Sequence, residues 1–193
     1  LKYLAIDFDI KEEEFQKTSA NNLTERLYKE VRDTFSRKTE TIAKQAFPVI
    51  KNVFEQRGEM FKNIVVPFTD GKRAYNVVAN LEKTYKSEGE ELIRAYEKSI
   101  MLAHIDDAWK EHLREMDDLK QSVQNATYEQ KDPLLIYKFE SFNLFKSMVD
   151  KINKNVVSTL MKGQIPFEAP EEVKQAEEKR TDLSKMRTGR SDA

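Results

Sequence analysis

The chain has 193 residues, and 33 basic side chains nearly cancel 34 acidic ones, which leaves no field to attract a nucleic-acid backbone. The absence of cysteine excludes disulfides and thiolate chemistry. No apolar run approaches the roughly 18 residues of a transmembrane segment. Charged residues make up 35% of the chain and glycine occupies only five positions, a composition typical of exposed helices. Because the first residue is Leu1 rather than Met, we expect an excised piece of a longer protein.

The first part of the chain predicts helices that follow an extended lead-in over residues 1–10. Asn22 with Glu25 three residues later resembles a capping box, and the apolar spacing that follows predicts a helix. Pro48 is expected to interrupt or kink that helix, because a proline removes an internal hydrogen bond. A second short helix is then predicted to end at Gly58.

Residues 63–78 predict a β-hairpin, the one non-helical element of the chain. Two short β-rich runs flank an Asp70-Gly71 turn, a strong local signal for antiparallel strands. Pro67 confines the first strand to an edge of the sheet. Because an isolated hairpin is marginally stable, it should lie against neighbouring helices, including a short one predicted over residues 81–86.

Two long amphipathic helices are predicted over residues 90–123 and 133–162. In both, apolar side chains recur every three or four residues, the period of one helix face. Asp132 before Pro133 is a favourable helix start, and Gly163 is a favourable stop. The polar break at 124–132 is short, so the two helices must fold back on each other as an antiparallel hairpin.

The large apolar residues of the two helices can be aligned as a single seam. With the turn centred near Tyr128, Leu119 lies opposite Phe139, and Trp109 lies opposite Val149 as a core anchor. We expect the seam to consist of Ile105, Trp109, Leu113, Met116 and Leu119 on the first helix and of Phe139, Phe142, Phe145, Val149 and Ile152 on the second.

No catalytic residue, metal site or bound cofactor is predicted. The five glycines do not form a phosphate-binding loop, so the chain is not expected to bind or hydrolyse nucleotide or to be an enzyme. His104 and His112 lie roughly 12 Å apart along one helix, too far to ligate one ion, and are expected to be surface or seam histidines. The carboxylates around Asp106 alternate with Lys and Arg at ion-pair spacing, which favours a solvated face.

Two long motifs carry a resemblance to a known family. The stretches IDDAWKEHLREMDDLKQSV and YEQKDPLLIYKFESFNLF resemble the C-terminal region of the preprotein translocase motor family SecA. GEELIRAYEKSIML before them is similar, more loosely, to the helical wing of that family. Asn125, Ala126 and Thr127 stand where the family usually has Leu-Arg-Gly.

The resemblance implies a mainly α fold: a long antiparallel two-helix hairpin plus a smaller helical wing with a short β-hairpin. Residues 1–88 would form the wing, 89–163 the helical scaffold with its two-helix finger, and 164–193 a C-terminal linker or tail. The tail has few core-forming residues, so it is expected to add little to folding.

The resemblance also implies a function. The finger would couple ATP-driven motor motion to polypeptide movement through the SecY channel and help to regulate the ATPase. Its tip residues Tyr128, Gln130 and Lys131 would contact the channel and the substrate, although the residues alone favour equally a Tyr128 ring folded back on the hairpin.

The implied partners are the SecYEG translocon, unfolded preprotein and the motor domains, with ATP and Mg²⁺ bound only by the parent protein. The implied location is the bacterial cytoplasm, peripherally at the inner membrane. The alternative is a stand-alone helical protein–protein interaction module, an adaptor that binds a partner helix along the seam.

Overall fold

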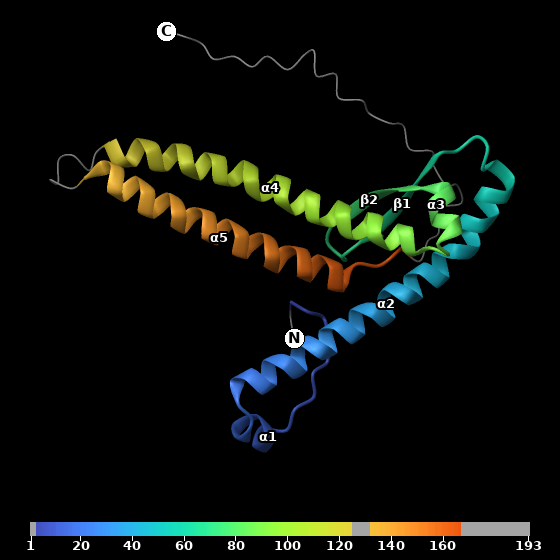
Figure 1. Cartoon of the computed structure of the whole chain (residues 1–193), viewed down its shortest axis with the longest axis horizontal. Helices are drawn as coiled ribbons and strands as arrows, with labels where there is room; N and C mark the ends of the chain where they lie inside the picture. The colour runs from blue at the N-terminus through green and yellow to red at the C-terminus, as the bar shows by residue number, and fades with distance from the viewer. Residues whose placement is uncertain (1–2, 125–131, 167–193) are drawn as a thin grey trace, which may run out of the picture.

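The computed structural model describes residues 3–124 and 132–166, and over these residues the fold is mainly helical with one small sheet. The elements in chain order are α1 (Glu12–Lys17), α2 (Ala20–Arg57), β1 (Asn63–Thr69), β2 (Ala74–Asn80), α3 (Leu81–Lys86), α4 (Glu90–Gln124) and α5 (Pro133–Lys162). Helices α4 and α5 run side by side, with the sheet and α3 at their base (Figure 1). The predicted mainly α fold with a β-hairpin is confirmed.

Helix α2 departs from the prediction in two ways. It begins after Ser19, whose hydroxyl accepts from the Asn22 amide at 3.4 Å, so Asn22 lies inside the helix rather than at its cap. It also continues through Pro48 to Arg57 as one helix of 38 residues capped by Gly58, so Pro48 does not interrupt it and no separate second helix forms. A proline removes one amide donor from the helix, and the burial of Ile42 before it and Ile50 after it in the core offsets that loss. The sequence did not predict α1, which buries no residue.

The β-hairpin is confirmed and extends to Asn80. Strands β1 and β2 pair antiparallel with Val66 opposite Val77. The turn follows from Asp70, whose carboxylate accepts from the amides of Lys72 and Arg73 at 2.8 Å each. Gly71 has a φ of 84°, a conformation that costs glycine little.

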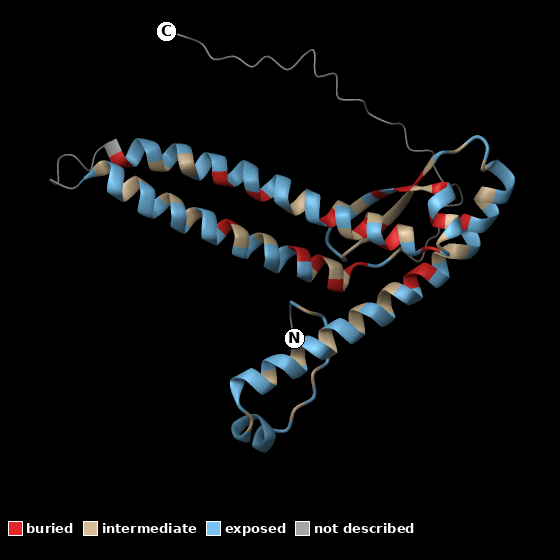
Figure 2. Cartoon of the chain, viewed as in Figure 1, coloured by how far each residue is buried: buried red, intermediate tan, exposed pale blue. Residues whose placement is uncertain are grey.

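One hydrophobic core lies where the sheet meets α2, α3 and α4 (Figure 2). The predicted boundary between the wing and the scaffold falls at residue 88. The core contains residues from both sides of this boundary, so the sheet and the start of α4 belong to one core. The core consists of Ile42, Ala43, Ile50, Ile64, Phe68, Val77, Ala79, Leu81, Leu92, Ile93, Tyr96 and Ile100. The hairpin of α4 and α5 is therefore anchored at its base by this core.

Tyr96 connects three elements inside the core. Its ring stacks on Phe68 of β1 with centroids 4.2 Å apart, and its hydroxyl donates to the Thr159 carbonyl of α5 at 3.1 Å. Gly163 ends α5 against the same ring, where a Cβ would overlap the Tyr96 hydroxyl. Burial raises the pKa of Tyr96 well above its ordinary value, so the hydroxyl keeps its proton and stays a donor.

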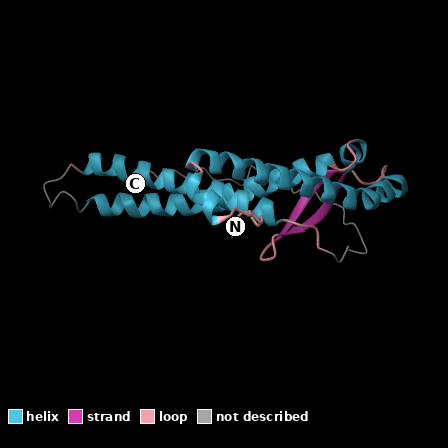
Figure 3. Cartoon of the chain, turned by 90° about the horizontal axis from the view of Figure 1, so that it is seen from below, coloured by secondary structure: helices cyan, strands magenta, loops and turns pink. Residues whose placement is uncertain are grey.

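The two arms of the hairpin extend well beyond the core. Seen from below, the sheet stands at one end of the hairpin and the arms project from it (Figure 3). At 1.5 Å per residue, α4 spans roughly 50 Å. Among the helices of residues 3–124 and 132–166, none is long and apolar enough to cross a membrane.

Candidate functional site

The candidate site is the outer end of the α4–α5 hairpin. The structure describes the two helix ends that border it. Helix α4 ends at Gln124, and Asp132 caps α5 by accepting from the Leu134 and Leu135 amides at 2.9 and 3.4 Å. This confirms the predicted start of the second helix. The predicted tip residues Tyr128, Gln130 and Lys131 lie outside the described residues, so their placement stays a prediction.

The seam between α4 and α5 follows a different stripe from the predicted one. Beyond residue 107, the buried or half-buried positions of α4 are Ala108, His112, Met116, Leu119 and Val123. On α5 the corresponding positions include Tyr137, Ser141, Leu144, Met148, Ile152 and Val156. Both sets keep the spacing of three or four residues that one helix face requires. The side chains at the seam are mostly smaller than the aromatic residues expected there.

Six of the ten predicted seam residues are exposed, and for these the prediction is wrong. They are Ile105, Trp109, Leu113, Phe139, Phe142 and Phe145, hereafter the outer stripe. Trp109 is 48% exposed and Phe142 65% exposed, so neither is a core anchor. Met116, Leu119, Val149 and Ile152 are half-buried. The physical reason is that each helix of a pair covers only a narrow face of the other, so a second apolar face needs a third element.

His112 lies in the seam between two members of the outer stripe. The centroid of its ring lies 5.7 Å from that of Trp109 on the same helix. It lies 6.1 Å from the centroid of Phe145 on α5, in an edge-on arrangement. The side chain is only 6% exposed, and its Nδ1 is buried without a hydrogen-bond partner among the described residues. His112 is thus a seam residue, and Trp109 and Phe145 flank it.

The base of the hairpin is held by polar contacts as well as by the core. His104 on α4 hydrogen-bonds through Nε2 to the Thr159 hydroxyl at 2.9 Å. Burial, together with the nearby Arg73 charge, lowers the pKa of His104, which favours the neutral ring in this bond. Arg73 in the β-turn also pairs with Asp107 at 3.4 Å. The first contact joins α4 to α5, and the second joins the β1–β2 turn to α4.

The carboxylates of α4 form exposed ion pairs rather than a reactive cluster. Asp106 pairs with Lys110 at 2.5 Å and Glu111 with Arg114 at 3.0 Å, all with exposed side chains. Pairs of this kind contribute little to stability. Across the described part of the chain, no group of three or more His, Cys, Asp or Glu could hold a metal ion.

The facing of Leu119 and Phe139 stays a prediction that disulfide crosslinking can test. Because the chain has no cysteine, Leu119→Cys with Phe139→Cys introduces the only thiol pair. The predicted register implies rapid crosslinking, because a disulfide forms only where the two Cβ atoms approach to about 4 Å. Since Phe139 is 65% exposed and lies in the outer stripe, slow crosslinking of this pair would show that the register fails together with that part of the seam. The matched control places cysteines at Leu119 and Val149. Crosslinking of the control pair and not of the first pair would show that the register is wrong.

With this geometry in place, the comparisons with known proteins identify the family. A profile of the SecA wing and scaffold domain matches residues 4–164. The chain is 53% identical to the protein translocase subunit SecA of Phocaeicola vulgatus over 91% of its own length and 16% of that relative. It is 51% identical to that of Bacteroides thetaiotaomicron over 97% of its length and 18% of the relative. No solved structure matches.

Over the described residues, the structure is a long two-helix hairpin carried on a base of one small sheet and the helices packed against it. The chain belongs to the SecA wing and scaffold domain family. It spans 16% to 18% of the length of these SecA relatives.

Proposed function

We propose that this chain is the wing-and-scaffold region of a preprotein translocase motor, and that its hairpin couples motor motion to polypeptide movement. The carrying observation is the family match over residues 4–164, which spans the base and both arms of the hairpin. The SecA relatives bear the name protein translocase subunit. The ATP-hydrolysing domains with their Mg²⁺ lie elsewhere in the parent protein, and this region helps to regulate them.

The form of the hairpin suits a lever. Its base is fixed to the sheet by the stacking of Tyr96 on Phe68 and by the Arg73–Asp107 ion pair, while α4 runs roughly 25 Å further, from Asp107 to Gln124. Paired helices with a continuous seam resist bending better than one helix does. Motion of the base is therefore transmitted to the tip.

The outer stripe supports contact with the parent motor. A contiguous exposed apolar surface on a folded domain marks an interaction site, and Trp109 and Phe145 flank the same seam histidine. The motor domains of the parent protein cover this stripe and grip the lever. The whole protein then acts at the cytoplasmic face of the inner membrane, bound peripherally to a SecYEG translocon.

The tip residues make the contact with channel and substrate. Tyr128 offers a large ring and a hydroxyl, which suit binding to many polypeptide sequences at low entropic cost. Gln130 and Lys131 add polar and cationic groups beside it. The unfolded preprotein is the substrate that these residues meet.

The second candidate is an adaptor that binds a partner helix along the outer stripe. The exposure of Phe139 and Phe142 favours it, because an amphipathic helix binds such a surface through apolar anchors. In that case the tip plays no part, and tip substitutions leave function unchanged.

The test is Tyr128→Ala in the full-length parent protein. Preprotein translocation is expected to slow roughly tenfold, the effect of losing about 1.4 kcal/mol of contact. In the isolated chain the same change should alter the free energy of unfolding by less than about 0.5 kcal/mol, as at ordinary surface sites. Tyr28→Ala, at an exposed tyrosine of α2, is the matched control. Unchanged translocation would favour the adaptor, and strong destabilisation would place Tyr128 in a core.

A further inference from the structure

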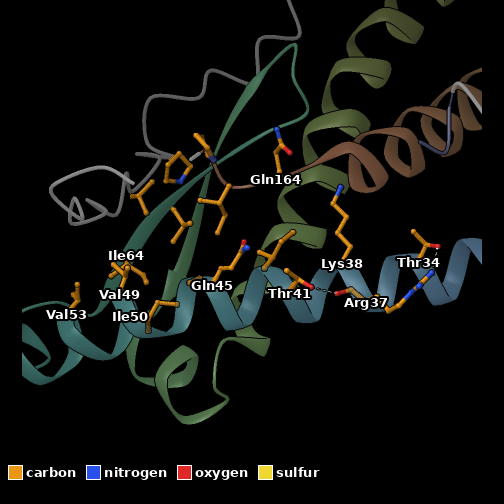
Figure 4. Close-up of a pocket in the computed structure, with 17 residues that line it drawn as sticks. Thr34, Arg37, Lys38, Thr41, Gln45, Val49, Ile50, Val53, Ile64 and Gln164 are labelled. Atoms are coloured by element: carbon orange, nitrogen blue, oxygen red, sulfur yellow. Dashed lines mark hydrogen bonds between the residues drawn. The ribbon is translucent and has the colours of Figure 1, made fainter. Parts of the chain in front are cut away.

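An apolar groove of about 700 Å³ lies between α2 and the free edge of β1. Val49, Ile50 and Val53 form its α2 wall, and Ile64 and Val66 form its β1 wall. Figure 4 shows the side chains of α2 rising toward Ile64, with Gln164 further along the groove. The groove shares no residue with the seam or the outer stripe, and the proposed function does not use it.

The last described residues, 164–166, line this groove. After α5, Gln164 pairs antiparallel with Thr69, and each amide donates to the other's carbonyl at 2.8 Å. Ile165 packs against the core, and Pro166 lines the groove. Lys38 of α2 donates to the Met161 carbonyl at 2.5 Å and holds the end of α5 beside the groove. The direction of the chain is thus along the free edge of β1.

The pairing at Thr69 sets the register that a continued strand would follow. Successive residues of a strand point to opposite faces, so such a strand would place Phe167 on the same face as Ile165, which packs on the core. In this register Phe167 would stand opposite Val66, at the β1 wall of the groove. Phe167 is the only aromatic residue after Pro166, and its size suits an apolar cavity.

The backbone cannot continue the ladder unaided. In the register set by the Thr69–Gln164 pair, Pro67 would stand opposite Pro166, and neither residue has an amide proton to donate. The next pair of hydrogen bonds is therefore absent, and side-chain burial has to hold the segment. The same lack of a donor at Pro67 makes this edge a poor site for a strand from another protein.

We propose that the chain's own segment 167–170 docks in this groove, with the Phe167 ring between β1 and α2. Its attachment at Pro166 gives it a high local concentration that no separate partner has. Docking covers the apolar wall of α2 and directs the rest of the linker away from the sheet. The segment acts through one side chain, so a single substitution should release it.

Thiol labelling of the full chain tests this proposal, because the chain has no cysteine of its own. Val49→Cys introduces a thiol on the α2 wall at a position that is 47% exposed in the described structure. With Phe167 present, a maleimide is expected to label this thiol roughly tenfold more slowly than with Phe167→Ser or in a chain that ends at Pro166. Tyr28→Cys on the same helix is the control and should label equally in all three backgrounds.

Equal labelling of the Val49→Cys thiol in all three backgrounds would overturn the proposal. Protection that rises with protein concentration would also overturn it, because the occupant would then be a second copy of the chain. Far-UV circular dichroism of each variant establishes that α2 is intact. Ending the chain at Pro170 should leave the protection unchanged, and loss of protection there would assign the docking to residues beyond the proposed segment.

Discussion

Replacing Tyr96 with alanine is expected to lower the free energy of unfolding by about 3–5 kcal/mol, the range for large-to-small changes in a core. Tyr96 is 1% exposed, stacks on Phe68 and hydrogen-bonds to Thr159, so its loss opens a cavity where the sheet, α4 and α5 meet. Urea denaturation of the isolated chain measures the change. We expect cooperative unfolding at a lower urea concentration.

Tyr96→Phe is the matched control for this prediction. It keeps the ring and its stack on Phe68, and removes only the hydroxyl that donates to the Thr159 carbonyl. That carbonyl still accepts from the Gly163 amide at 2.8 Å, so the expected cost is about 0.5–1.5 kcal/mol. Equal, small losses for both variants would show that the base of the hairpin does not depend on this ring.

Replacing Trp109 with alanine should affect the stability of the isolated chain little and translocation by the parent protein strongly. Because the side chain is 48% exposed, the isolated chain is expected to lose less than about 1 kcal/mol. In the parent protein the motor is proposed to cover the outer stripe, so translocation should slow roughly tenfold. Met101→Ala, at an exposed apolar residue nearer the base of α4, is a control for general surface effects. If Trp109→Ala destabilised the isolated chain as much as Tyr96→Ala, the ring would belong to the core after all.

The sequence predicts the elements whose signals are local. Asp132 before Pro133 starts a helix by satisfying backbone amides, and the Asp70-Gly71 turn supplies both a cap and a positive φ. Such signals need no knowledge of distant residues. The hairpin follows from them, since two long helices with a short connection have to pack antiparallel.

The sequence fails where tertiary contacts choose between local options. Helix α4 carries two overlapping apolar stripes, and the larger residues, such as Trp109, suggest the wrong one. The structure places Ala108 and His112 in the seam and leaves the larger side chains outside. Pro48 likewise remains inside α2, although its local effect favours a break. In both cases the surrounding packing decides the outcome.

The candidate site and the groove, too, are only partly predictable from the sequence. The motifs around Tyr128 indicate a family and a tip, but the tip itself lies outside the described residues. The groove beside β1 has no signal in the sequence, because it depends on how Val49 of α2 and Val66 of β1 are placed relative to each other by the fold. Only the fold brings those walls together.

We propose that the hairpin tip meets the moving polypeptide and its channel. A photo-crosslinking amino acid at position 128 of the full-length protein tests this during ATP-driven translocation, with the same residue at position 28 as the control. We expect adducts with the preprotein and the channel from position 128, and none above background from position 28. Adducts from position 28 alone, or from neither position while translocation proceeds, would contradict the account.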